Sequence, residues 1–151
     1  MLGVVAPWTV SRVDLSVETG RVDGWAEHLR RTRFICPECE RELAVYDHSE
    51  ERSWRHLDSY AFLTYLHARP PRVQCPTHGV HQARVPWAEP NSRLTVLFER
   101  LGIDVLKECD VTGAAWLLRL SWDEAWHLMD RAVTRGLAAR PLVVPARIGG
   151  G

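Results

Sequence analysis

The chain has 151 residues, of which 46% are hydrophobic, so it can build the core of one domain or of two small ones, and a fully disordered chain is excluded. Its 19 Lys and Arg residues balance its 19 Asp and Glu residues, so no overall charge attracts nucleic acid and any DNA affinity must come from local patches. The opening Met1–Pro7 lacks a basic region and is too short for a signal peptide or membrane span. We therefore expect a cytoplasmic protein with no membrane partner.

The first third of the chain has the pattern of extended structure. Val10, Val13 and Leu15 precede a turn at Glu18–Arg21, after which Val22 leads to Trp25, and this order predicts a two-stranded hairpin. A basic cluster follows, and it supplies three candidate DNA contacts at Arg30, Arg31 and Arg33. A solvated turn is the alternative reading of the same cluster.

Two metal-type pairs bracket the next segment. Cys36-Pro37-Glu38-Cys39 and Cys75-Pro76-Thr77-His78 each place two ligands three residues apart, the spacing at which a tight loop directs both donors at one tetrahedral ion. Three thiolates and one imidazole leave no open coordination position, so we predict one structural Zn²⁺ on Cys36, Cys39, Cys75 and His78. Short strands or a small helix are expected between the pairs, and Trp54 is expected to be a packing anchor.

Other interpretations of these residues are open. Cys36 and Cys39 could form a redox pair or be two buried thiols, and His81 could replace His78 as the fourth ligand. His48, His56 and His67 are expected to be surface or hydrogen-bonded core residues, and Cys109 a small buried apolar residue.

A proline-rich segment separates two periodicities. Val85–Pro90 has two prolines within five residues and predicts a linker, in which Trp87 is expected to pack. Helical periodicity follows, with a helix over 93–108 after Ser92 as N-cap and a second over 113–118 after Thr112. A third runs from a capping box at Ser121–Glu124 to Arg135 and is terminated by Gly136.

The expected fold class is α+β: a small β-rich zinc-finger domain is followed by a three-helix domain of helix-turn-helix type. We place a β-hairpin and zinc-finger domain at residues 8–84, a linker at 85–92, the helix-turn-helix domain at 93–138 and a loose tail at 139–151.

The third predicted helix is the element that enters the major groove in this plan. Its outward residues supply DNA-binding candidates, and arginines before and after it supply phosphate contacts; together the candidates are Arg119, His127, Arg131, Thr134, Arg135 and Arg140. Asp123 and Glu124 at its start disfavour strong binding. Trp116, Trp122 and Trp126 are expected in the core, and a plain three-helix packing or dimerisation unit is the alternative.

Several motifs in this order resemble the N-terminal half of transposases of the ISL-three insertion-sequence family. They are Cys36–Cys39, Trp54–Asp58, Arg72–Gly79, Val85–Ala88 and Leu120–Asp123. The resemblance covers roughly residues 8–140, and it implies a zinc finger and a helix-turn-helix that bind the transposon's terminal inverted repeats. In the family a catalytic RNase H-like domain with metal-binding carboxylates follows.

Two features depart from that family. No acidic residue follows Asp130, and a two-metal phosphoryl-transfer site needs several carboxylates, so we expect no enzyme activity from this chain. Glu40 and Arg119 occupy positions where the family usually has glycine, so either these turns are strained or the fold has drifted.

The leading hypothesis is a truncated transposase-like protein that binds inverted-repeat DNA without catalysing transposition. A homodimer or a complex with a full-length transposase is a further expected partner. The alternative is a zinc-stabilised protein-interaction or dimerisation module with no DNA role. A third possibility is an enzyme completed by a second chain.

Overall fold

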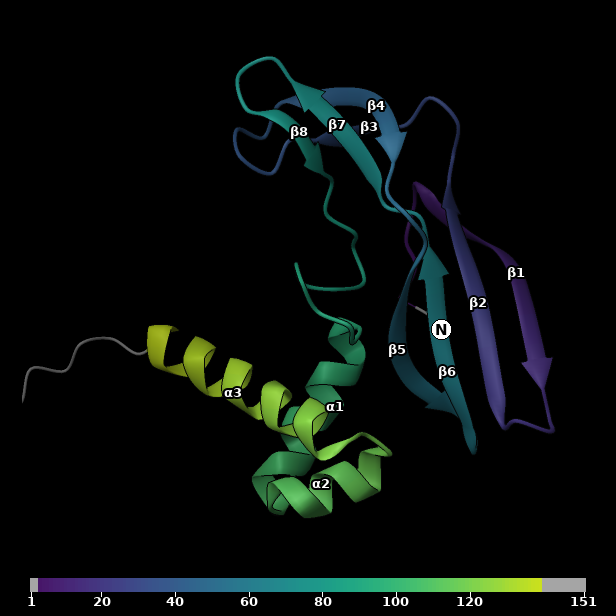
Figure 1. Cartoon of the computed structure of the whole chain (residues 1–151), viewed down its shortest axis with the longest axis vertical. Coiled ribbons are helices and arrows are strands. Elements are labelled where there is room, and N and C mark those ends of the chain that lie inside the picture. The colour runs from purple at the N-terminus through teal and green to yellow at the C-terminus, as the bar shows by residue number, and fades with distance from the viewer. Residues whose placement is uncertain (1–2, 140–151) are drawn as a thin grey trace, which may run out of the picture. The chain divides into compact units, whose positions relative to one another are not determined.

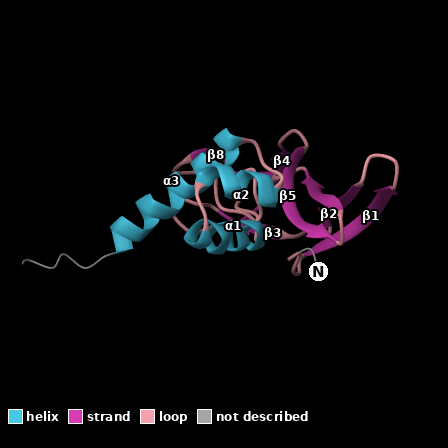
Figure 2. Ribbon diagram, turned by 90° about the horizontal axis from the view of Figure 1, so that it is seen from below, coloured by secondary structure: helices cyan, strands magenta, loops and turns pink. Residues whose placement is uncertain are grey.

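In the computed structural model, which describes residues 3–139, strands come first in the chain and helices follow (Figures 1 and 2). The described elements are β1 (Trp8–Ser16), β2 (Arg21–His28), β3 (Arg33–Ile35), β4 (Glu42–His48), β5 (Arg52–Ser59), β6 (Phe62–Ala68), β7 (Pro71–Cys75), β8 (Gly79–Gln82), α1 (Val96–Glu108), α2 (Val111–Leu118) and α3 (Trp122–Ala139). This layout confirms the expected α+β class.

The chain divides into two compact units, Met1–Arg100 and Leu101–Gly151, called here the N-terminal and C-terminal units. The division falls within α1, so the first turns of that helix belong to the N-terminal unit. No helix among residues 3–139 is long and apolar enough to cross a membrane. The predicted tail at 139–151 and the candidate Arg140 lie outside the described residues, apart from Ala139 at the end of α3.

The first sheet of the N-terminal unit has the strand order β1-β2-β6-β5. The predicted hairpin is present: β1 and β2 pair antiparallel from Trp8 opposite His28 to Ser16 opposite Arg21. Gly20, with φ of +62°, lies in the turn between them. β2 pairs in parallel with β6, and β6 pairs antiparallel with β5. The β5–β6 hairpin, which comes from the segment between the two metal-type pairs, therefore completes the sheet begun by the N-terminal hairpin.

The second sheet of this unit has the order β3-β4-β7-β8, with every pair antiparallel. β4 and β7 are far apart in the sequence but pair through Val45 opposite Val73. The guanidinium of Arg72 also forms an ion pair with Asp47 across these strands and, through its hydrogen bonds, lowers the pKa of that carboxyl. This pairing brings the ends of β3 and β7, which carry the two metal-type pairs, into one sheet.

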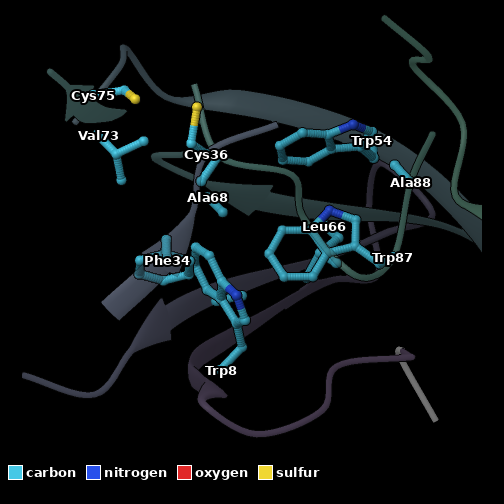
Figure 3. Packing of buried hydrophobic residues seen from close by; sticks show 12 residues of the cluster. Trp8, Phe34, Cys36, Trp54, Leu66, Ala68, Val73, Cys75, Trp87 and Ala88 are labelled. Carbon is cyan, nitrogen blue, oxygen red and sulfur yellow. The ribbon is translucent and has the colours of Figure 1, made fainter. Parts of the chain in front are cut away.

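The hydrophobic core of the N-terminal unit is rich in tryptophan (Figure 3). Trp87 makes edge contacts with Trp8 and Trp54, at ring-centroid distances of 4.9 and 5.5 Å. Phe34 and Leu66 complete the centre of this cluster. The segment 85–92, expected as a linker, is irregular as its prolines require, yet it places Trp87 and Ala88 in this core. The expectation that Trp54 and Trp87 are packing anchors is confirmed.

The residues just before α1 are joined to the edge of the first sheet. The N–H of Arg55 donates to the carbonyl of Arg93, and the N–H of Thr95 donates to the carbonyl of Arg55. His56 is buried and its Nδ1 lies 2.9 Å from the hydroxyl of Thr95. The prediction that Ser92 is the N-cap of α1 is wrong, because the helix begins at Val96. Thr95 takes the capping position, and its Oγ1 accepts from the N–H of Phe98. The hydroxyl of Ser92 instead donates to the carboxylate of Glu99. The pairing with β5 keeps 93–95 extended and delays the helix.

In the C-terminal unit, α1 approaches α3 closely at Gly102, where a Cβ atom would lie 2.3 Å from a methyl carbon of Leu128. Ala114, Ala115, Leu118, Ala125 and Leu128 are the buried apolar residues of α2 and α3. Small residues therefore allow the helices of this unit to pack at short range.

Two predicted helix ends in this unit are wrong. The N-cap of α2 is Asp110, whose carboxylate accepts from the N–H of Gly113 at 2.7 Å, and not Thr112. Gly136 does not terminate α3, which continues to Ala139. A glycine ends a helix only where the backbone turns left-handed, and Gly136 is not among the residues with positive φ.

The expected burial of three tryptophans is also wrong. Trp116, Trp122 and Trp126 are 79%, 52% and 38% exposed. Their apolar character fitted a helical periodicity, but the core sides of α2 and α3 are occupied by alanines and leucines. Cys109 is half-buried, and its thiol donates to the carbonyl of Val105 at 3.3 Å.

Candidate metal centre and nucleic-acid interface

The first metal-type pair forms the turn between β3 and β4. The N–H of Cys36 donates to the carbonyl of Arg41, and the N–H of Glu40 donates to the carbonyl of Cys36, each at 2.9 Å. Glu40 has a φ of +61°. This turn, at which the resemblance described above implies a glycine, is formed here with a glutamate in the left-handed region, where residues other than glycine are strained.

The second pair forms the turn between β7 and β8, in which Cys75 is opposite Gly79. Gly79 has a φ of +78° and follows His78, as Glu40 follows Cys39. The two turns therefore share one plan: two donors three residues apart, then a left-handed residue that returns the chain to a strand.

The structure brings the four predicted donors together. The donor atoms of Cys36, Cys39, Cys75 and His78 all lie within 4.8 Å of one another. The sulfurs of Cys39 and Cys75 are 3.6 Å apart, and Nδ1 of His78 is 3.5 Å from the sulfur of Cys75. A tetrahedral zinc with bonds of about 2.3 Å to sulfur and about 2.0 Å to nitrogen separates its ligands by roughly 3.8 Å and 3.5 Å. The donor set and its spacing fit zinc.

Each half-site contributes one buried and one exposed donor. Cys36 and Cys75 are 0% and 2% exposed and belong to the hydrophobic core, whereas Cys39 and His78 are exposed. A metal ion at this place would join the core to the outer ends of both turns. This position agrees with a structural role, since four protein donors leave no position for a substrate.

Hydrogen bonds from backbone amides favour the thiolate form of one cysteine, which is the form that binds a metal. The N–H of Thr77, with further donors from His78, lowers the pKa of Cys75 to about 6. The pKa of Cys39 is raised, because desolvation and the neighbouring thiols Cys75 and Cys36 outweigh the N–H of Arg41 that favours its thiolate. Cys75 is therefore the first of this pair to ionise and a ready ligand near neutral pH.

His81, the alternative fourth ligand, lies outside the cluster. Its Nε2 is 2.7 Å from the carbonyl oxygen of His78, which can only accept, so His81 donates to the backbone of the second turn. His81 is not among the grouped donors of the described residues. The geometry therefore favours His78 and gives His81 a supporting contact.

The helix-turn-helix is formed by α2, the turn 119–121 and α3. Arg119, with φ of +54°, ends α2 by donating its N–H to the carbonyl of Trp116. The predicted capping box is present: the hydroxyl of Ser121 accepts from the N–H of Glu124, whose carboxylate accepts from the N–H of Ser121. As at Glu40, the left-handed turn is retained without glycine.

The predicted DNA contacts lie in two separate places. Arg119, His127, Thr134 and Arg135 are exposed in the C-terminal unit, whereas Arg131 is half-buried. Nδ1 of His127 donates to the carbonyl of Asp123 at 2.6 Å, which fixes its ring along α3. Arg30, Arg31 and Arg33 are exposed in and beside the turn from β2 to β3, where Arg31 has a φ of +61°.

One group of titratable residues was missed by sequence reasoning. His28 and His48 come from β2 and β4, and Arg69 follows β6; they line one pocket with Glu27, Arg30 and Glu51. Their spacing along the chain follows no motif, so only the pairing of strands could reveal them.

Two consecutive parts of the chain match known protein families. Residues 32–78 match the family model described as the zinc-finger of transposase IS204/IS1001/IS1096/IS1165. Residues 83–133 match that of the helix-turn-helix domain of transposase family ISL3. Together with the cluster of three cysteines and one histidine, the first match identifies one structural zinc.

Two curated relatives carry the name transposase for insertion sequence element IS1557, from the CDC 1551 / Oshkosh and ATCC 25618 / H37Rv strains of Mycobacterium tuberculosis. Each is 35% identical over 97 residues, which are 64% of this chain and 22% of the relative. The chain thus matches about a fifth of the length of these relatives. No solved structure matches.

Proposed function

We propose that the chain is a member of the ISL3 family of insertion-sequence transposases, whose zinc-finger and helix-turn-helix models match residues 32–78 and 83–133. In this proposal it binds the terminal inverted repeats of an insertion sequence as a zinc-stabilised DNA-binding protein and does not itself catalyse transposition. The capped helix-turn-helix carries this proposal, because α3 presents His127, Thr134 and Arg135 outside the helical core. In such a motif the second helix reads bases in the major groove.

The zinc ion supports this function without taking part in it. We propose Cys36, Cys39, Cys75 and His78 as its ligands, on the evidence of their common position within 4.8 Å. Bound zinc would supply the cross-link that fixes both turns to the core. The boundary at 85–92 stays our proposal for the junction between the zinc-ribbon and helix-turn-helix modules.

The proposal of no catalysis is supported by the donor set among the described residues. Transfer of a phosphoryl group by two metals needs converging carboxylates, whereas the grouped metal-type donors among residues 3–139 are three cysteines and one histidine. Such a protein would occupy transposon ends and compete with a full-length transposase.

Binding is tested by fluorescence anisotropy of the zinc-loaded chain with terminal-repeat duplex and with a scrambled duplex of equal length and composition, at fixed salt. We expect preference for the repeat, reduced by His127→Ala. We expect Arg30→Ala to weaken binding to both duplexes alike, as a phosphate contact does. Equal affinity of the wild-type chain for the two duplexes would contradict the proposal.

A protein-interaction module is the second candidate, favoured by the apolar side chains exposed on α2 and α3. Trp116 and Leu117 are 79% and 57% exposed, and Trp122 is 52% exposed. Analytical ultracentrifugation of the wild-type chain and Trp116→Ser tests this function. A dimer that dissociates in the variant, together with no DNA preference, would favour it over DNA binding.

A further inference from the structure

The first sheet of the N-terminal unit has one protected edge and one free edge (Figure 1). At the β5 edge, the segment just before α1 pairs with the backbone of Arg55. At the opposite edge, β1 pairs with β2 and with no other described strand. With nine residues β1 is the longest described strand, whereas β3 and β8, at the edges of the second sheet, have three and four. A long free edge presents backbone groups with which another strand can pair.

The pairing of β2 determines which backbone groups of β1 face this edge. The N–H of Leu63 on β6 donates to the carbonyl of Gly20, and backbone groups along a strand point alternately to its two sides. Residues 21, 23 and 25 therefore direct their backbone groups toward β1, where their partners are Ser16, Asp14 and Arg12. Val13 and Leu15 alternate with these partners, so their N–H and C=O groups face the free edge.

The side chains of Val13 and Leu15 are apolar and uncovered, at 57% and 60% exposure. Their partners on β2 lie on the same face of the sheet as Ala26, which belongs to the hydrophobic core. The core thus reaches Ala26 and leaves the far end of the hairpin without cover. An uncovered apolar face beside an unpaired edge favours association with another strand.

The charges of β1 favour a second copy of this chain as the partner. Arg12 and Asp14 flank Val13 on the opposite face of the sheet; their side chains are each 61% exposed and form an ion pair at 3.5 Å. The guanidinium carbon of Arg12 lies 3.7 Å from the ring centroid of Trp25, which holds it over the sheet. When two β1 strands pair antiparallel about a two-fold axis at Val13, Arg12 of each copy lies opposite Asp14 of the other.

Other two-fold registers are less favourable. An axis at either charged residue would place like charges opposite each other, and the backbone groups of both residues face β2. An axis at Leu15 would pair Val13 with Val17, whose carbonyl already accepts from the N–H of Gly20 in the hairpin turn. The axis at Val13 pairs residues 10–16, all of which lie within β1.

We propose that the chain forms a homodimer through the free edge of β1, with Val13 on the two-fold axis and two reciprocal ion pairs between Arg12 and Asp14. The two four-stranded sheets then form one continuous sheet. β1 shifts register against β2 between Val10 and Arg12, so the pairs next to the axis define the contact. A single strand buries less than the about 1,600 Å² of a standard interface, so we expect a weak dimer with a Kd on the order of micromolar.

This inference goes beyond the proposed function, because it assigns a partner to the N-terminal unit and does not depend on DNA. Sedimentation velocity of the zinc-loaded chain over low to high micromolar concentrations tests it. We expect a monomer–dimer equilibrium in the wild-type chain and a monomer in Val13→Pro, which removes an N–H that faces the free edge and none that binds β2.

Trp116→Ser is the matched control, since it removes an exposed apolar side chain of the C-terminal unit. This variant should dimerise as the wild-type chain does. A wild-type chain that stays monomeric at every concentration would overturn the proposal, and so would a dimer that Trp116→Ser dissociates and Val13→Pro leaves intact.

Charge variants test the register without removing a backbone group. Arg12→Asp and Asp14→Arg should each be monomeric alone, because like charges then lie opposite each other. Mixed in equal amounts they should form a heterodimer, since the two charges of one copy are then opposite in sign to those of the other. Zinc content and near-ultraviolet circular dichroism show that each variant is folded. A mixture of folded variants that stays monomeric would overturn the proposal.

The outcomes for the dimer and for DNA binding are independent of each other. A monomer that prefers terminal-repeat DNA would overturn the β1 dimer and leave DNA recognition by α3 intact. A β1 dimer that shows no preference for this DNA would support the present inference and contradict the proposed function.

Discussion

The N-terminal unit buries three of its four tryptophans and leaves Trp25 half-buried, whereas the C-terminal unit exposes its tryptophans. Trp8, Trp54 and Trp87 are at most 4% exposed. In the C-terminal unit Trp116 and Trp122 are more than half exposed, and alanines fill the core in their place. The two units thus reach a compact state by different means, one with large aromatic side chains and a metal centre, the other with close helix packing and capped helix ends.

This difference teaches that hydrophobic residues of one type need not serve one purpose in a chain. In a small β unit with irregular segments, large side chains that contact both sheets and an ion that joins distant turns increase the stability of the fold. A short helical unit can close its core with small residues, so its tryptophans are available to contact a partner.

The largest expected effect comes from removing the metal centre. Cys36→Ser should abolish zinc binding and unfold the N-terminal unit, because the ion joins two turns that no disulfide connects. Zinc content should fall from about one per chain to none, and the near-ultraviolet circular dichroism of the tryptophan core should be lost. The helices of the C-terminal unit should persist in the far-ultraviolet signal.

Cys109→Ser is the matched control, since Cys109 lies in the C-terminal unit and outside the cluster. It should retain stoichiometric zinc. A stably folded N-terminal unit without metal would show that the core alone suffices.

A pair of tryptophan truncations compares the two units directly. Trp87→Ala should lower the free energy of unfolding by about 3–5 kcal/mol, since it empties the centre of the aromatic cluster. Trp116→Ala should change it by less than about 0.5 kcal/mol, because the side chain is 79% exposed. Urea denaturation of the zinc-loaded chain measures both values.

Trp87→Phe refines this comparison. The indole N–H of Trp87 is buried with no hydrogen-bond partner among the described residues, so removing it should recover part of the loss seen with alanine. Equal destabilisation by Trp87→Ala and Trp116→Ala would break the contrast between the units.

Two glycines test the close packing of the C-terminal unit. Gly102→Ala should destabilise by about 1–3 kcal/mol, because the added methyl group meets Leu128. Gly136→Ala should stabilise by roughly 0.5–1 kcal/mol, since it lies within α3 with no atom near its Cβ position. Thermal unfolding followed by circular dichroism at 222 nm shows whether each variant has a higher or lower melting temperature than the wild-type chain. An unchanged melting temperature in Gly102→Ala would refute close packing at this position.

The smallest expected effects concern the left-handed turns. Glu40→Gly and Arg119→Gly should each stabilise the chain by about 0.5 kcal/mol, since relief of the left-handed strain exceeds the entropy that glycine adds to the unfolded state. Glu38 lies in the same turn as Glu40 but does not have a positive φ, so Glu38→Gly should destabilise the chain by adding entropy to its unfolded state. Melting temperatures compare the three, and a loss of stability in Glu40→Gly would show that its side chain contributes more than its backbone costs.

Local features of the site were predictable because short-range chemistry decides them. The spacing within Cys36–Cys39 and Cys75–His78 confines two donors to one turn, and the box at Ser121–Glu124 depends on residues three apart. Helix starts were less predictable: the extended pairing of 93–95 with β5 moved the start of α1 past Ser92, and Asp110 displaced Thr112 as N-cap.

The sequence by itself determined the α+β order, the two donor pairs Cys36–Cys39 and Cys75–His78, and the capped third helix, since each depends on neighbours within a few positions. The tertiary structure alone decided that Trp87 is buried and Trp116 exposed, and that His28 meets His48. Burial and long-range contacts depend on which strands pair, and the pairs β2–β6 and β4–β7 join distant parts of the chain.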